Sequence, residues 1–187
     1  MVQTPARSIT LQAFLKLPET TPASEYINGQ IIQKPMPQGK HSRLQRKLLN
    51  AINDVVELDN IAEAFPELRC TFGGRSTIPD IAVFLRSRIP TDVTGEIANI
   101  FSICPDWVIE ILSPNQSATK VTDNILHGLE HGCQMGWLVD PQERSILVYP
   151  RHRQPQLFNQ SATEISIPDF AANLKISVEQ LFGWLQI

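Results

Sequence analysis

A chain of 187 residues with 42% hydrophobic and 19% charged residues is long enough for one folded domain over residues 1–187 and too apolar for a disordered chain. The formal net charge of −3 argues against a broad electrostatic surface for nucleic acid, although it is compatible with a local basic cluster that serves a small site. No stretch reaches the roughly 18 apolar residues of a membrane span, and the three cysteines are widely spaced. We therefore expect a cytoplasmic protein with no membrane partner.

The first third of the chain predicts a loose end, a short helix, a hairpin and a long helix. Residues 1–7 show no periodic pattern and are expected to form a loose N-terminal end, followed by a helix from Ser8 or Thr10 to Leu17. Asn28-Gly29 is the preferred dipeptide of a type I′ turn and predicts a hairpin. Apolar residues at helical spacing then predict a helix from His41 to Glu57.

The first two turns of this long helix carry a basic cluster, which consists of Lys40, His41, Arg43, Arg46 and Lys47. Such a cluster usually forms a solvated surface. The alternative is a bound phosphate, because cations at a helix N-terminus are unfavourable unless an anion binds there. His41 likewise has alternative roles: a phosphate contact, a proton shuttle or a structural residue.

The middle of the chain predicts strands around a single crossover helix. Residues 61–72, with a kink or bulge at Pro66-Glu67, and residues 78–85 are expected to form two antiparallel strands joined by Gly73-Gly74-Arg75-Ser76. A long loop is expected over 86–104. The strand at 107–112, a helix from Ser117 or Thr119 to near Gly132 and the strand at 135–140 predict a βαβ unit with parallel strands.

The last part of the chain predicts weaker strands and a terminal helix. Strands are expected at 145–149, 156–158 and 164–167, and an amphipathic helix within 177–187. The apolar face of that helix is expected to cover a sheet or to form a homodimer interface.

Two apolar strands each carry one carboxylate, Asp80 in the first and Glu110 in the second. An ionised side chain in such a strand is costly unless it is paired or binds a metal. Either acid alone is compatible with a position at a strand end, where it reaches water or an arginine. If adjacent strands bring the two acids together, their repulsion favours a shared cation, and oxygen ligands suit Mg²⁺. The pair therefore suggests a metal-dependent hydrolase.

The acid pair resembles that of the PD-(D/E)XK nuclease superfamily, and the wider sequence resembles a restriction-endonuclease-like family of unknown function that is abundant in cyanobacteria. The wider resemblance covers about residues 11–184 and rests on Tyr26-Ile27-Asn28-Gly29, Gly39-Lys40-His41, Pro79-Asp80 with Val83, Glu110-Ile111-Leu112-Ser113-Pro114 and Gly136-Trp137-Leu138-Val139-Asp140-Pro141. It implies an α/β (α+β) fold with a restriction-endonuclease-like core, in which helices flank a mixed β-sheet and the acids lie at strand ends beside a groove.

The resemblance also implies a metal site and a substrate. Asp80, Glu110 and the backbone carbonyl of Ile111 would hold Mg²⁺, with Mn²⁺ as a substitute, and would support hydrolysis of a DNA phosphodiester bond. The superfamily places a lysine two residues after the glutamate, but Leu112 stands there. The nearer family moves this lysine to the following helix, around positions that hold Asp123 and Asn124 here. Lys120, about one turn earlier, is one remaining candidate for the catalytic set, and Lys40 with His41 on the long helix is the other.

Three hypotheses follow: a Mg²⁺-dependent DNA endonuclease, a catalytically impaired module that binds nucleic acid, and a structural homodimer of the same fold. The first is the main hypothesis, while the missing lysine and the acidic net charge support the second. Glu25 and Glu67 would either extend the metal shell or be structural, and we expect the structural role. Arg69 and Arg75 would hold a phosphate or neutralise Glu67, and we expect neutralisation.

Overall fold

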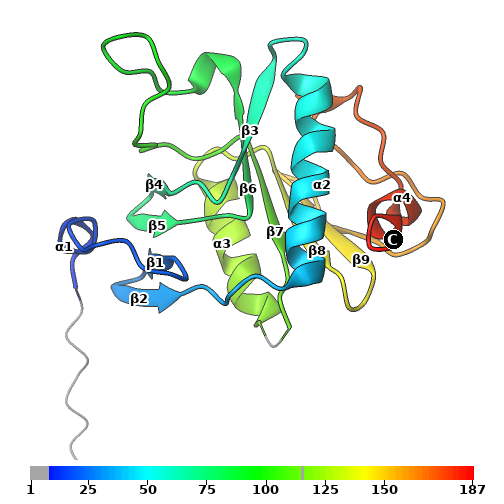
Figure 1. Cartoon of the computed structure of the whole chain (residues 1–187), viewed down its shortest axis with the longest axis horizontal. Helices are drawn as coiled ribbons and strands as arrows, with labels where there is room; N and C mark the ends of the chain where they lie inside the picture. The colour runs from blue at the N-terminus through cyan, green and yellow to red at the C-terminus, as the bar shows by residue number, and fades with distance from the viewer. Residues whose placement is uncertain (1–8, 115) are drawn as a thin grey trace, which may run out of the picture.

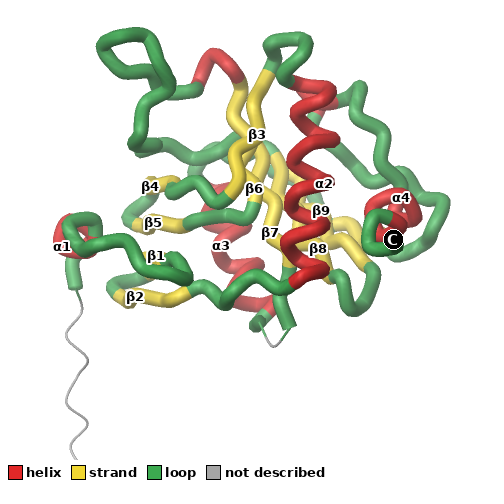
Figure 2. The backbone as a smooth tube through the Cα atoms, in the orientation of Figure 1, coloured by secondary structure: helices red, strands yellow, loops and turns green. Residues whose placement is uncertain are grey.

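The computed structural model describes residues 9–114 and 116–187, which form two β-sheets flanked by helices (Figures 1 and 2). The loose end predicted at residues 1–7 lies outside the described residues. Within the described ranges, no helix is long and apolar enough to cross a membrane. The mixed α+β architecture predicted from the sequence is confirmed.

The larger sheet has the strand order β10-β9-β8-β7-β6-β3. Its strands are β3 (Ala62–Pro66), β6 (Ile81–Leu85), β7 (Trp107–Ile111), β8 (Met135–Asp140), β9 (Ser145–Pro150) and β10 (Gln156–Phe158). Strands β7 and β8 are parallel and α3 (Ala118–Glu130) connects them, which confirms the predicted βαβ unit. The other neighbouring pairs of this sheet are antiparallel.

The smaller sheet has the order β2-β1-β5-β4 and lies beside the edge of the larger one (Figure 1). It consists of β1 (Ser24–Ile27), β2 (Gln30–Gln33), β4 (Cys70–Phe72) and β5 (Arg75–Thr77). Asn28 and Gly29 have φ values of 51° and 81°, the left-handed conformation that a type I′ turn requires, so the predicted hairpin is confirmed. Helix α1 (Leu11–Phe14) is shorter than predicted and begins after its N-cap, Thr10.

The single strand predicted at 61–72 is wrong, because it is divided into β3 and β4. Strand β3 pairs with β6 in the larger sheet, whereas β4 pairs with β5 in the smaller sheet. The break follows Pro66, which has no amide hydrogen for a ladder, and Glu67 has a positive φ of 47°. The strand predicted at 78–85 begins only at Ile81, and Arg75 and Ser76, predicted in the turn, lie in β5. The segment that contains Asp80 therefore joins the two sheets.

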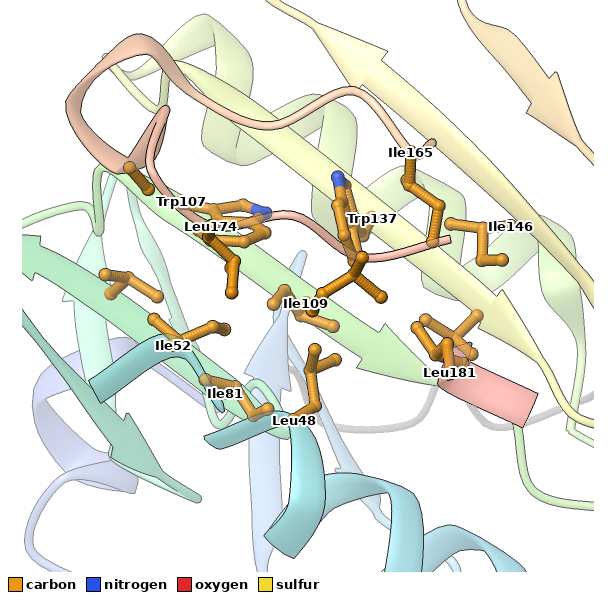
Figure 3. Packing of buried hydrophobic residues seen from close by; sticks show 14 of the residues in the cluster. Leu48, Ile52, Ile81, Trp107, Ile109, Trp137, Ile146, Ile165, Leu174 and Leu181 are labelled. Carbon is orange, nitrogen blue, oxygen red and sulfur yellow. The ribbon is translucent and has the colours of Figure 1, made fainter. Parts of the chain in front are cut away.

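Helices cover both faces of the larger sheet. Helices α2 (Gly39–Val56) and α4 (Val178–Gly183) pack on one face. In this layer the rings of Trp107 and Trp137 meet edge to face, with their centroids 5.0 Å apart (Figure 3). Helix α3 packs on the other face through Val121 and Ile125. Successive residues of β7 alternate between these two layers, as a strand buried on both faces must.

The C-terminal region differs from prediction in one element. Where a strand was predicted at 164–167, the described chain has an isolated bridge between Glu164 and Ser177, although Ile165 is buried in the core. Short 3₁₀ turns lie at Arg86–Arg88 and Asp169–Ala171. The apolar residues of α4 pack inside the chain and so cover the sheet, while the homodimer stays a prediction.

A substitution at Gly136 in β8 tests the packing of α3 on the sheet. A Cβ atom there would lie 2.2 Å from Cγ2 of Ile125, whose side chain is fully buried. We expect Gly136→Ala to lower the free energy of unfolding by about 1–3 kcal/mol, measured by urea denaturation. Gly183→Ala is the matched control, because no atom lies within 4 Å of a Cβ at that position. Equal stability of the two variants would contradict this packing.

Candidate active site

Asp80 directly precedes β6, whereas Glu110 lies within β7, so the expectation that both acids lie in strands holds for Glu110 alone. Strands β6 and β7 are antiparallel with Ile81 opposite Ile109, and extension of this register by one residue puts Asp80 opposite Glu110. The two residues are 3% and 4% exposed, respectively, so both carboxylates lie inside the protein. The break between the two sheets opens the strand ladder at this point and makes room for polar partners.

The cation between the two acids is Lys34, a residue that the sequence analysis missed. Its Nζ lies 2.9 Å from Oδ1 of Asp80 and 3.7 Å from Oε2 of Glu110, and it donates a hydrogen bond to the carbonyl of Ile78 at 2.6 Å. Lys34 follows β2, so the hairpin turn at Asn28-Gly29 returns the chain to this position. In the sequence, a single lysine after a short strand gives no sign of such a contact.

The second oxygen of Asp80 contacts two of the predicted site residues. Nε2 of His41, on the first turn of α2, lies 3.0 Å from Oδ2 of Asp80, and the amide of Ile111 donates to the same oxygen at 2.7 Å. Ile111 thus contacts Asp80 through its N–H, whereas the metal ligand predicted from the resemblance is its carbonyl. Nδ1 of His41 is buried and has no hydrogen-bond partner in the part of the chain that the structure describes.

A third carboxylate belongs to the same buried cluster. Oε1 of Glu25, on β1, accepts a hydrogen bond from the amide of Ile78 at 2.8 Å, and the side chain is buried. Glu67 is exposed instead. The sequence offered no means to distinguish these two acids, because only the pairing of β1 with β5 carries Glu25 to the site.

The expectation that Arg69 and Arg75 neutralise Glu67 is wrong. Arg69 pairs with Glu19 at 2.6 Å and Arg75 pairs with Asp123 at 2.8 Å. Both arginines join separate segments of the chain, because each has a carboxylate closer in the fold than Glu67.

The charges in the cluster shift each other's pKa values in opposite directions. Burial favours neutral Asp80, but Lys34 and the hydrogen bond from His41 outweigh burial and lower its pKa to about 2. Burial raises the pKa of Glu110 to about 8 despite the attraction of Lys34. Burial also raises the pKa of Glu25. Although burial opposes its charge, the surrounding carboxylates hold the pKa of Lys34 above its usual value.

None of the α3 residues considered as sources of the catalytic cation, Lys120, Asp123 and Asn124, brings a cation to Asp80 or Glu110. Lys120 is exposed in the first turn, and within residues 9–114 and 116–187 its ammonium makes no ion pair. Asn124 lines a small cavity of about 10 Å³ together with Glu110, and its Oδ1 is buried without a partner among residues 9–114 and 116–187. The α3 side chain that lines this cavity with Glu110 is thus a neutral amide.

Two adjoining cavities lead to this cluster. One of about 290 Å³ is lined by Lys34, His41 and Asp80 and by the exposed segment Pro35-Met36-Pro37. The second, of about 520 Å³, is lined by Gly39 and Lys40 at the start of α2 and by the turn after β8. His41, Ser113 and Gln116 line both cavities, which therefore share a wall.

The donor set fits a divalent cation. Glu25, Asp80 and Glu110 bring three carboxylates to Lys34, so negative charge exceeds positive charge when all are ionised. Burial is the largest cause of the raised pKa values of Glu25 and Glu110, and repulsion from the neighbouring carboxylates adds to it. Oxygen ligands of this kind suit Mg²⁺, and a cation beside them would favour their ionised forms.

The mixed sheet flanked by helices, with one acid just before β6 and the other in the neighbouring β7, places the molecule in the restriction-endonuclease-like class. The chain belongs to the Uma2 family, described as "Putative restriction endonuclease", whose model matches residues 11–179. It is also similar to the crystal structure of "a putative nuclease belonging to DUF820 from Anabaena variabilis ATCC 29413", with 60% identity and a TM-score of 0.93. That match covers 95% of this chain and 99% of the other. A comparison with functionally curated proteins gives no match.

The raised pKa of Glu110 predicts a specific pH dependence of stability in the absence of metal. Between its ordinary value of 4.5 and about 8, Glu110 binds more protons in the folded than in the unfolded protein. The free energy of unfolding therefore falls as the pH rises through this window, by at most about 1.4 kcal/mol per pH unit from this group. Asp80 acts in the opposite direction, below about pH 4.

Glu110→Gln should flatten this slope in urea denaturation with EDTA between about pH 5 and 8. Glu57→Gln, at an exposed residue just after α2, is the matched control and should retain the wild-type slope. A slope that is the same in the Glu110→Gln and Glu57→Gln proteins would refute the assignment.

Proposed function

We propose that the protein is a Mg²⁺-dependent endonuclease that hydrolyses DNA phosphodiester bonds at the Asp80–Glu110 pair. The observation that carries this proposal is the pair of buried carboxylates, Asp80 just before β6 and Glu110 in β7, with the ammonium of Lys34 between them beside a cavity. The family to which the chain belongs and the similar cyanobacterial structure support a nuclease.

In this proposal, Asp80, Glu110 and the carbonyl of Ile111 hold Mg²⁺, which supplies Lewis-acid polarisation of a phosphate oxygen and a lowered pKa of a bound water. Lys34 takes the part of the lysine that the superfamily places after the glutamate. Its ammonium would offset the negative charge that develops on the phosphate oxygens in the transition state. The hairpin thus delivers a cation that Leu112 and Asn124 do not provide.

His41 is the proposed proton acceptor. Because its Nε2 donates to Asp80, the neutral ring carries its lone pair on Nδ1, which is buried and has no partner in the described chain. In this proposal, a water that enters from the cavities lined by His41 gives its proton to this atom during attack on phosphorus. The contact with Asp80 also fixes the orientation of the ring.

The start of α2 is the proposed binding site for the phosphate backbone. The first amides of a helix have no intrahelical acceptors, and Gly39 and Lys40 line the larger cavity. Not every residue of the basic cluster is available for this role, because Arg43 donates to the carbonyls of Trp184 and Gln186. Arg43 instead holds the C-terminus against α2.

Carboxamide variants of the two acids test the proposal in a nicking assay on supercoiled DNA. With Mg²⁺ or Mn²⁺ we expect cleavage that EDTA abolishes and that Asp80→Asn and Glu110→Gln each reduce by at least about a hundredfold. Single-stranded DNA and RNA serve as comparison substrates. Folded protein that retains DNA in a salt-dependent manner but cuts none of these would instead support the binding module without catalysis.

A comparison of two lysines tests the role of Lys34. Lys34→Met should lower the cleavage rate about a hundredfold or more, whereas Lys120→Met should leave it near the wild-type rate. Because a buried cation is lost, thermal unfolding must first show that Lys34→Met is folded. Asn124→Lys in the Lys34→Met protein should then recover part of the rate, since residue 124 lies beside Glu110. Equal rates for the two single variants would exclude this role of Lys34.

A further inference from the structure

A second cluster of ligand-type side chains lies at the C-terminal end of α3. His127, Glu130 and His131 are spaced i, i+3 and i+4 and therefore share one face of the helix. One ligand atom of each lies within 4.8 Å of those of the other two. None of the three lines the cavities beside Asp80, so the cluster is separate from the candidate active site.

Hydrogen bonds hold both imidazoles in a state that suits metal binding. Nε2 of His127 donates to the carbonyl of Phe72 at 3.3 Å, which leaves the lone pair of the neutral ring on Nδ1. Nδ1 of His131 donates to the carbonyl of His127 at 2.8 Å, which leaves the lone pair on Nε2. Histidines that bind metals in proteins typically donate their other ring N–H to such a carbonyl.

Packing fixes the ring of His127, whereas the side chains of Glu130 and His131 can adjust their positions. His127 is 8% exposed and stacks on Phe72 with ring centroids 5.1 Å apart. His131 and Glu130 are exposed. The ring of His131 lies against Gly73 in the turn between β4 and β5, where an added Cβ would come within 2.3 Å of Nε2. Residue 73 leaves room for the imidazole because it has no side chain.

We propose that His127, Glu130 and His131 form a Zn²⁺ site that connects the end of α3 to the β4–β5 hairpin. Two neutral imidazoles and one carboxylate match the ligands that Zn²⁺ prefers, with a water in the fourth tetrahedral position. The all-oxygen set of Asp80 and Glu110 suits Mg²⁺ instead, so the two sites select different metals. Because His127 and His131 both contact the hairpin at Phe72 or Gly73, bound Zn²⁺ stabilises the native packing of these elements.

Calorimetric Zn²⁺ titration of tag-free protein tests this site. All proteins carry Asp80→Asn and Glu110→Gln, so that the acid pair does not contribute to binding. We expect one Zn²⁺ per chain, with affinity at least about tenfold weaker in His131→Gln and in Glu130→Gln. His152→Gln is the matched histidine control, because His152 is exposed in a turn remote in sequence from α3, and it should bind like the parent protein.

Both test residues are exposed, so their variants should fold, whereas His127→Gln removes a buried ring and requires a check of the unfolding temperature. Zn²⁺ should also raise the unfolding temperature of the parent protein and of His152→Gln more than that of His131→Gln. Zn²⁺ affinity that does not change in His131→Gln, or that falls equally in His152→Gln, would overturn the proposal.

Discussion

The balance of charge around Lys34 is the interaction on which the candidate site depends. Three carboxylates are removed from water at the junction of the two sheets, and an uncompensated buried carboxylate is costly or remains protonated. The ammonium of Lys34 lies within ion-pair distance of two of them. Its presence explains why Asp80 remains ionised, and the surplus of carboxylates explains why the cluster is suited to a further cation.

Each of the two sheets positions different residues of this cluster. The larger sheet aligns Asp80 with Glu110 through the antiparallel register of β6 and β7. The smaller sheet contributes Glu25 and then, after one tight turn, Lys34. Because the chain passes from β5 to β6 through Ile78 and Asp80, a change in the pairing of the small sheet would move the cation relative to both acids.

Local patterns predicted those parts of the molecule that depend on nearby residues. Asn28-Gly29 specifies its turn, and the apolar strands around the helix at 118–130 specify the βαβ unit, so both were found from the sequence. The two acids were conspicuous because charge is rare in such strands. Lys34 was not, since its role arises from a contact 46 residues away along the chain with Asp80. The split of the 61–72 strand between two sheets likewise depends on tertiary pairing that periodicity does not encode.

The central claim is that the acid pair is a site for a divalent cation, and anomalous diffraction from crystals soaked in Mn²⁺ tests it most directly. The expected result is a Mn²⁺ peak in contact with the carboxylates of Asp80 and Glu110, with Lys34 still nearby. At a Mn²⁺ concentration that supports cleavage, an ordered site with no peak between these carboxylates would contradict the claim.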